Sequence, residues 1–354
     1  MTKPRARDLG VPFTGTPGPF NAITDVPGVE VGMHTLIEGA NVRTGVTAIL
    51  PRGRKTPLSN VPAALFSLNG NGEMTGSHWL EESGKLGGPI AITNTHSIGA
   101  VHEGVCRWLV DADGEGALRF MLPVVAETFD GTLSDINGFH VRPEHAMAAL
   151  DAAKTGPVME GNHGGGTGMI THQFKGGNGT ASRRVDIDGA AYTLGCFVQS
   201  NYGLREQLTI AGVPVGREIT DLMPEIGSGA NGDGSIIAVV ATDAPLLPHQ
   251  CKRLARRISM GLARLGSTAT NGSGDIFIAF STAVPHGRNV HSWAALDNEL
   301  MNPLFQATVE SVEEAIVNAL IAAETMTGLH GTVIHALPHD RLRETLAKYH
   351  RLTT

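Results

Sequence analysis

The sequence predicts an α/β protein in which layers of helices cover layers of strands. Apolar runs of strand length recur along the chain and are largely apolar on both faces, as strands buried on two sides are. Between them lie stretches with the three- and four-residue spacing of amphipathic helices. This mixture is typical of layered α/β folds. The 354 residues are enough for a large core, and no internal repeat or long linker divides them.

Seven apolar runs are expected to form strands. Glycine, at 45 of 354 residues, clusters at their ends. Such clustering indicates tight turns or places where the backbone approaches a ligand or another chain closely. The runs are VTAILP near Val46, AALFSLNG near Ala63, PIAITNT near Pro89, AYTLGCFVQSN near Ala191, SIIAVVAT from Ser235, DIFIAFST from Asp275 and TVIHALP from Thr332.

Three stretches are expected to form helices. The first follows Pro248, which suits a first helical turn, and Gly266 can end it. The third covers Pro143 to Lys154. The first helix has an apolar face made of Cys251, Leu254, Ile258 and Leu262. The second has an apolar face made of Val309, Val312, Ile316 and Leu320.

Composition excludes several functional classes. No apolar run approaches the ~18 residues that a membrane helix needs, and the first residues do not resemble a signal peptide. A net charge of -7 argues against nucleic acids and anionic membranes as partners. Three cysteines without metal spacing suit reduced thiols, so we expect a cytoplasmic protein.

Familiar catalytic and phosphate-binding motifs do not explain the glycines. Gly227, Gly229 and Gly232 fit G-x-G-x-x-G, but a strand follows them where a dinucleotide site needs a helix. GNHGGGTGM from Gly161 has no lysine for a phosphate loop and favours a close-packed turn or a pocket wall. There is no G-x-S-x-G, no H-E-x-x-H and no ligand spacing among the histidines, so nothing calls for a metal.

The junction between Gly234 and Ser235 is unusual because the polar loop GSGANGDG leads directly into the apolar run from Ser235. One interpretation is a surface turn that opens a strand. The other is a cleavage site. Cleavage would make Ser235 a new N-terminus, whose α-amine, titrating near ~7.7–8.0, could act as the base for its own hydroxyl. The spacing alone leaves both open.

Several motifs in the same order indicate a family. The chain resembles the self-processing aminopeptidases, which include L-aminopeptidase/D-Ala-esterase-amidase and the β-peptidyl aminopeptidases. The resemblance covers nearly the whole sequence. The motifs are FNAITDVPGVEVG at Phe20, NGNGEMTG at Asn69, TNTHSIGAVHEG at Thr93, ETFDGTLSDINGFHV at Glu127, EGNHGGGTGM at Glu160, VQSNYG at Val198, NGDGSIIAVVATDAP at Asn231, NGSGDIFIAFST at Asn271 and TGLHG at Thr327.

The resemblance implies an α/β/β/α sandwich, here a single domain of residues 1–354. It would be made of two fragments of one precursor, residues 1–234 and 235–354, usually assembled as a tetramer of such pairs. Gly234 and Ser235 would flank the cleaved bond, with Ser235 as the nucleophile.

The resemblance also implies roles for five further residues. Asn201 would help to stabilise the oxyanion, and Ser273 and Asp275 would bind the nucleophile and its amine. Glu127 would receive the substrate ammonium, beside Phe129 in the substrate site. From the residues alone, Asn201 could instead cap a turn, Ser273 and Asp275 could form a turn before a strand, and Glu127 could be exposed.

The implied activity is release of N-terminal residues from short peptides, amides or esters through an acyl-enzyme, without a metal or organic cofactor. Two alternatives remain open: an acyltransferase of the same fold that uses an amine acceptor, and a glycine-rich binding module with an intact chain. The preference among α-, β- and D-residues also stays open.

Overall fold

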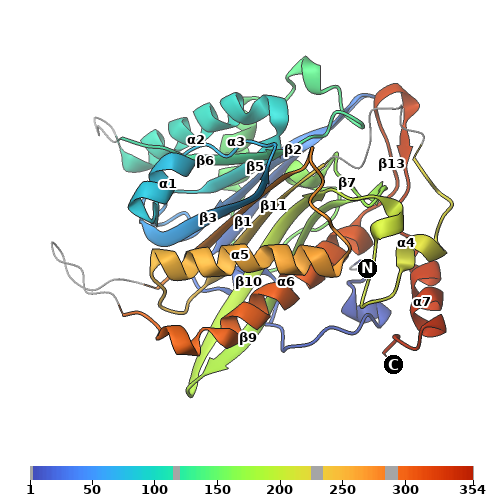
Figure 1. The fold of residues 1–354 in the computed structure, drawn as a ribbon. Coiled ribbons are helices and arrows are strands. Elements are labelled where there is room, and N and C mark those ends of the chain that lie inside the picture. Colours follow the sequence, from blue (N-terminus) through green and yellow to red (C-terminus); the bar gives the residue numbers. More distant parts are fainter. Residues whose placement is uncertain (1–2, 115–119, 225–233, 284–293, 354) are drawn as a thin grey trace.

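The computed structural model describes residues 3–114, 120–224, 234–283 and 294–353 (Figure 1). Two β-sheets are stacked face to face between two layers of helices, which confirms the four-layer α/β/β/α arrangement. The polar loop Gly227–Gly234 lies outside the described residues except for Gly234.

The smaller sheet has the strand order β1-β2-β5-β6, and the larger sheet has the order β4-β3-β12-β11-β10-β9. The smaller sheet consists of β1 (Glu30–Glu38), β2 (Val42–Leu50), β5 (Ile90–Asn94) and β6 (Val124–Thr128). The larger sheet consists of β4 (Lys85–Leu86), β3 (Val61–Gly70), β12 (Gly274–Ser281), β11 (Ser235–Thr242), β10 (Ala190–Asn201) and β9 (Gly177–Ile187). Two short hairpins pair β7 (Ile170–Thr171) with β8 (Phe174–Lys175), and β13 (Met326–Thr327) with β14 (Val333–Ile334).

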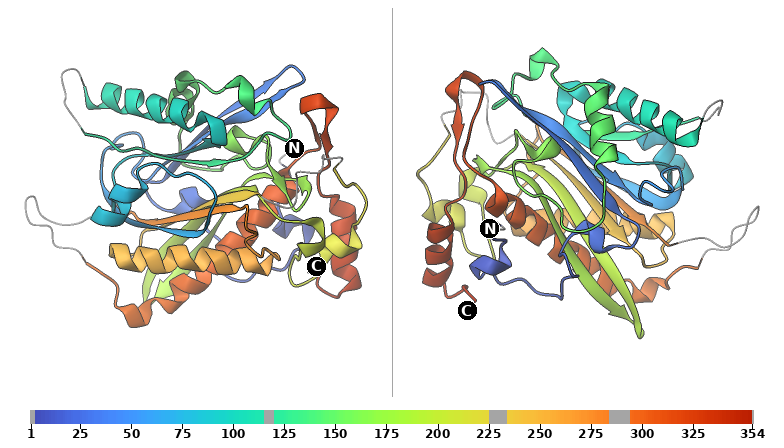
Figure 2. Two further views of the ribbon diagram at one scale, coloured as in Figure 1. Left: turned by 45° about the horizontal axis from the view of Figure 1, so that its top comes forward. Right: turned by 180° about the vertical axis from the view of Figure 1, so that it is seen from behind.

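Helices α2 and α3 cover the smaller sheet, and α5 and α6 cover the larger one (Figures 1 and 2). The helices are α1 (Ser77–Ser83), α2 (Ile98–Asp113), α3 (Pro143–Asp151), α4 (Val215–Glu218), α5 (Pro248–Arg264), α6 (Asn302–Ala322) and α7 (His339–Lys348). No helix in the described ranges is both long enough and apolar enough to cross a bilayer.

Three apolar layers fill the spaces between these four layers. Along β11, Ile236, Ala238 and Val240 pack toward α5 and α6, whereas Ile237 and Val239 pack toward the smaller sheet. This alternation explains why the run is apolar on both faces, and each buried Ile or Val contributes about 1.5–3 kcal/mol. A third cluster, with Val101, Val105 and Leu109 of α2, separates the outer helices from the smaller sheet.

Six of the seven expected strands and all three expected helices are present, although α3 ends at Asp151. The expectation for TVIHALP is confirmed only at Val333–Ile334, which forms the short strand β14 in a hairpin apart from both main sheets. Ile334 packs there in a small cluster with Leu133 and Met326. Strands β1 and β9 escaped detection because they carry charged residues, such as Arg183 in β9.

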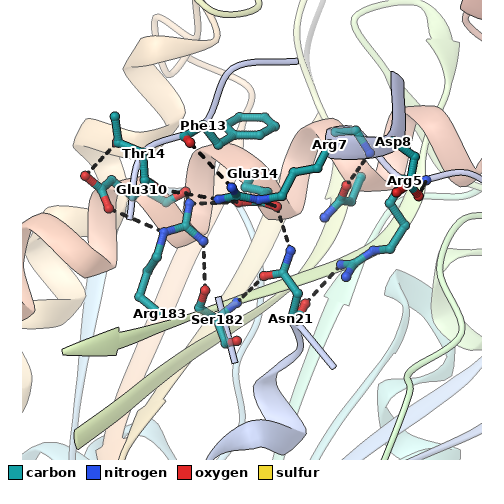
Figure 3. A network of polar contacts seen from close by, with 12 residues as sticks. Arg5, Arg7, Asp8, Phe13, Thr14, Asn21, Ser182, Arg183, Glu310 and Glu314 are labelled. Atoms are coloured by element: carbon teal, nitrogen blue, oxygen red, sulfur yellow. Dashed lines mark hydrogen bonds and ion pairs between the residues drawn. The ribbon is translucent and has the colours of Figure 1, made fainter. Parts of the chain in front are cut away.

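A buried network of charges ties the N-terminal segment to α6 and β9 (Figure 3). The Arg183 guanidinium lies 2.7 Å from a carboxylate oxygen of Glu314 and 3.3 Å from one of Glu310. Arg7 contacts the same Glu314 carboxylate at 2.8 Å, and the Asn21 amide donates to it at 2.6 Å. The Arg183 side chain is 1% exposed and that of Glu314 is fully buried. Each buried charge in this network therefore depends on its partners.

We expect Glu314→Ala to lower the free energy of unfolding by roughly 3–5 kcal/mol, because it leaves the buried Arg183 charge incompletely paired. Glu313→Ala is the matched control. It removes the adjacent carboxylate, whose partner Arg264 is 48% exposed, and such a pair contributes about 0–1 kcal/mol. Denaturant unfolding measures both variants. Equal losses would show that the buried network contributes no more than a surface pair.

Candidate active site

Strand register places Ser235 between two other residues of interest. The antiparallel pairing of β10 with β11 sets Asn201 opposite Ser235, and the parallel pairing of β11 with β12 sets Ser235 opposite Gly274. Directly paired residues point to the same face of a sheet. Since Ile237 packs between the two sheets, Ser235 and Asn201 also face the smaller sheet. Ser235 is 5% exposed and Asn201 is 7% exposed.

The peptide group before Ser235 is held within the larger sheet. The Gly234 carbonyl accepts a hydrogen bond of 3.0 Å from the backbone N–H of Gly274. A Cβ atom on Gly234 would lie only 2.0 Å from the Asn201 carbonyl oxygen, so no larger residue fits without a backbone shift. An exposed hairpin turn does not describe this junction, because Ser235 is buried in the middle of a sheet.

The side-chain amide of Asn201 is fixed at both ends. Its Oδ1 accepts a hydrogen bond of 2.8 Å from the Ile170 backbone N–H, and its Nδ2 donates to the Phe129 carbonyl at 2.9 Å. The second Nδ2 hydrogen has no protein acceptor among these contacts and can donate to an oxygen beside Ser235. The amide joins three strand ends, which is more than a turn cap requires.

Ser273 and Asp275 form a buried pair beside β11. The Ser273 hydroxyl donates to Asp275 Oδ1 at 2.6 Å. Burial raises the pKa of Asp275 to about 6, although the hydrogen bonds from Ser273 and from the Ile236 backbone N–H act in the opposite direction. Oδ2 of Asp275 has no hydrogen-bond partner within the described residues, so the pair can accept one more donor at the start of β11.

Tyr202 adds a second unpaired group to this region. Its hydroxyl is buried without a partner in the described part of the chain. Burial raises the pKa of Tyr202, and the negative charge of nearby Asp275 raises it further. Tyr202 directly follows Asn201, so the motif VQSNYG was the signal that could have identified it.

Glu127 is buried on the smaller sheet and is not exposed at a strand end. Its carboxylate accepts hydrogen bonds from the Thr95 hydroxyl and from the Glu73 backbone N–H. Burial raises its pKa, and both hydrogen bonds oppose that rise. A Cβ atom on Gly72 would lie 3.1 Å from Glu127 Oε1 and 3.2 Å from the Gly274 Cα. Gly72 therefore lies between the Glu127 carboxylate and Gly274, the residue that is paired with Ser235.

Phe129 extends the site toward solvent. Its side chain is 47% exposed, while its carbonyl holds the Asn201 amide. The structure thus brings Asn201, Ser235, Ser273, Asp275, Glu127 and Phe129 to one end of the stacked sheets. Sequence reasoning missed Thr95, Ile170 and Tyr202, of which Ile170 contributes only a backbone N–H and leaves no sequence signal.

This arrangement offers a hydroxyl, an amide donor and two buried carboxylates, which suits acyl transfer. Across the residues that the structure describes, no three His, Cys, Asp or Glu side chains are grouped to hold a metal ion. The carboxylates differ in environment, since Asp275 lies in the larger sheet beside β11 and Glu127 in the smaller one.

Comparisons with known proteins extend this geometric description. The model for peptidase family S58 matches residues 21–334. The β-peptidyl aminopeptidase BapA of Sphingosinicella microcystinivorans is 53% identical, over 99% of this chain and 93% of the relative. The structure of L-aminopeptidase D-Ala-esterase/amidase from Ochrobactrum anthropi, described as a prototype for the serine aminopeptidases, matches with a TM-score of 0.93 and 50% identity. It covers 99% of this chain and 100% of that chain.

A Burkholderia sp. β-aminopeptidase structure matches with a TM-score of 0.89 and 47% identity, over 98% of this chain and 99% of that one. The Ochrobactrum enzyme is described as a new variant of the Ntn hydrolase fold. The family resemblance inferred from the sequence motifs is therefore confirmed. Since the family model spans most of the chain and these relatives match it almost from end to end, the chain belongs to peptidase family S58 and is a peptide-bond hydrolase.

Proposed function

We propose that this protein is a self-cleaving aminopeptidase whose nucleophile is Ser235 after it becomes an N-terminus. The observation that carries the proposal is the position of Ser235. It is the first residue of a buried central strand and lies opposite the amide-bearing Asn201, and the next residue, Ile236, is paired with Asp275, whose Oδ2 has no hydrogen-bond partner within the described residues. A hydroxyl held in this way needs only an adjacent base to become a nucleophile.

Self-cleavage follows from the same geometry. The Ser235 hydroxyl attacks the Gly234 carbonyl carbon and the C–N bond breaks, so that the acyl group moves from nitrogen to oxygen and the α-amine takes up a proton. Water then hydrolyses the ester and leaves a carboxylate on Gly234 and a free hydroxyl on Ser235. The hydrogen bond from Gly274 to the Gly234 carbonyl supports this step, because it polarises the bond under attack.

Substrate cleavage would reuse these groups. The free α-amine of Ser235 accepts the hydroxyl proton while the oxygen attacks the carbonyl of the first substrate residue. Asn201 Nδ2 donates to the oxyanion, and the proton passes to the leaving amine. Water releases the acyl group. We propose that Asp275 Oδ2, which has no hydrogen-bond partner within the described residues, accepts a hydrogen bond from the α-ammonium and holds that amine.

The substrate class rests on Glu127. A carboxylate buried between Thr95 and Glu73 is a suitable receptor for a substrate ammonium, because that charge would compensate the cost of its burial. The enzyme would then require a free amino terminus on a short peptide, amide or ester. The relatives are described as a β-peptidyl aminopeptidase and an L-aminopeptidase D-Ala-esterase/amidase, which supports activity on small amides.

The fragments 1–234 and 235–354 would remain together after cleavage. Strand β11 pairs with β10 on one side, and helix α6 supplies Glu310 and Glu314 to Arg183 of β9. Both sets of contacts join residues on opposite sides of the cut.

The first test is processing. We expect the wild type to show two masses, for residues 1–234 and 235–354, and Ser235→Ala to stay whole and inactive because the attacking hydroxyl is missing. Ser281→Ala is the control, since it removes a buried hydroxyl at the opposite end of β12. Intact-mass spectrometry separates the forms. An uncleaved Ser235→Ala chain with wild-type hydrolysis of aminoacyl amides would contradict the proposed nucleophile.

The second test concerns the ammonium site. Wild-type enzyme should cleave aminoacyl p-nitroanilides and refuse their N-acetylated forms, and Glu127→Gln should lose most of this discrimination. Glu73→Gln, which changes the neighbouring side chain, should retain it. The readout is the ratio of kcat/KM for free and acetylated substrates. A ratio near one in the wild type would remove the aminopeptidase assignment but not the hydrolase assignment.

The third test is pH dependence. The pKa of Asp275 is raised to about 6, so the carboxylate is ionised above this pH and protonated below it. The α-amine that acts as the base gives one acid limb near ~7.7–8.0, and loss of the ionised carboxylate that holds it should add a second acid limb to kcat/KM below about pH 6. Asp275→Asn should lower activity and remove this second acid limb. A second acid limb that persists unchanged in Asp275→Asn would assign it to another group.

A further inference from the structure

Lys175 is a fully buried lysine that forms no ion pair with a carboxylate in the part of the chain that the structure describes. It lies in β8 of the short hairpin β7–β8, and its side chain is 0% exposed. Burial lowers its pKa to about 7, and no neighbouring charge contributes to that shift. A buried ammonium is costly unless its hydrogens are satisfied. The reason for a lysine here must therefore lie in the groups that its Nζ contacts.

Within the described residues, the Nζ atom donates hydrogen bonds to two backbone carbonyls and to no side chain. It donates to the Met169 oxygen at 2.7 Å and to the Gly176 oxygen at 2.9 Å. The Gly176 N–H also donates to the Met169 oxygen, at 2.9 Å. The carbonyl of Met169 is therefore held by two donors, of which one comes from an amine.

The peptide group that Lys175 holds leads directly to the active site. The carbonyl of Met169 and the N–H of Ile170 belong to one rigid, planar peptide group. That N–H donates to Asn201 Oδ1 at 2.8 Å. A hydrogen bond to the carbonyl polarises the peptide group and strengthens its N–H as a donor, and the same holds for the amide of Asn201. The contacts form a chain from Lys175 Nζ to Asn201 Nδ2.

The geometry points to Lys175 as a positioning residue that orients and polarises the Asn201 amide for oxyanion stabilisation. The inference rests on the proposed function, because it assumes that Asn201 donates to the oxyanion. It adds a residue that touches neither the substrate nor the reacting atoms. Lys175 acts on Asn201 through the Met169–Ile170 peptide group.

The test is a double-mutant cycle on the full chain, with kcat expressed per processed molecule from intact-mass measurement. Asn201→Ala should lower kcat by roughly 10²–10³. Lys175→Met, which keeps an unbranched apolar side chain but removes the donor, should lower kcat roughly 10-fold at nearly unchanged KM. In the Asn201→Ala background the same Lys175→Met change should alter kcat less than about 2-fold, since the pair acts as one unit.

Arg205, in the 3₁₀ helix Arg205–Gln207, provides a matched control because it holds the turn of the same hairpin. Its guanidinium is also buried and donates to the carbonyls of His172 and Gln173, but it does not contact the Met169–Ile170 peptide group. Arg205→Met should lower the thermal stability while it leaves kcat per processed molecule within about 3-fold of the wild type. Where a variant processes too slowly for turnover measurements, residues 1–234 are co-expressed with a fragment that begins at Ser235, so that kcat is measured without self-cleavage.

The outcomes separate the two levels of inference. An unchanged rate in Asn201→Ala would overturn the proposed oxyanion donor itself. A large effect of Asn201→Ala with no effect of Lys175→Met would leave the proposed function standing and overturn the role of Lys175. Equal effects of Lys175→Met in both backgrounds, or an equal loss in Arg205→Met, would reduce Lys175 to a structural residue. A rate loss from Lys175→Met that occurs only when Asn201 is present would support the positioning role of Lys175.

Discussion

The pairing of β11 on both sides is the constraint on which the rest of the site depends. Because β10 and β12 flank β11, the register fixes Ser235 opposite Asn201 and opposite Gly274 at once. Neither neighbour can slip by one residue without turning the buried Ile and Val side chains to the wrong face. The apolar layers therefore hold the polar end of the strand, so packing energy far from the chemistry positions the reacting groups.

The site also depends on polar groups that are buried at a cost. Glu127, Asp275 and Lys175 each have a pKa displaced by burial, and each is satisfied mainly by backbone groups or hydroxyls and not by an opposite charge. Such groups are poised to accept a further charge, because a new partner recovers part of the desolvation cost. The contrast is the network of Arg183 with Glu310 and Glu314, where opposite charges are already paired and the role is structural.

Glycine serves this architecture at specific points. At Gly234 the Asn201 carbonyl leaves no room for a side chain, and at Gly72 the gap between Glu127 and Gly274 is filled by backbone alone. The Gly164–Gly166 turn, which the sequence favoured as a close-packed turn or pocket wall, is buried, and a Cβ on Gly165 would lie 2.1 Å from the Gln199 side chain. The high glycine content thus reflects close backbone approach as well as turns.

The sequence by itself determined the layered fold class, six of the ten described strands of the two main sheets and, through motifs in order, the family. It also named the residues now found at one end of the sheets. Local signals sufficed there because continuous apolar runs and helical spacing are properties of neighbours in the chain. Strand β9 was missed because Arg183 is charged, and only the tertiary structure shows that Glu310 and Glu314, far along the sequence, allow its burial.

The contacts made by backbone atoms were likewise decided only by the tertiary structure. The Ile170 N–H on Asn201, the Phe129 carbonyl and the Lys175 bond to Met169 have no sequence signature, since every residue carries the same peptide group. What selects them is the distance between segments that are remote in the chain, and that distance exists only once the two sheets have packed.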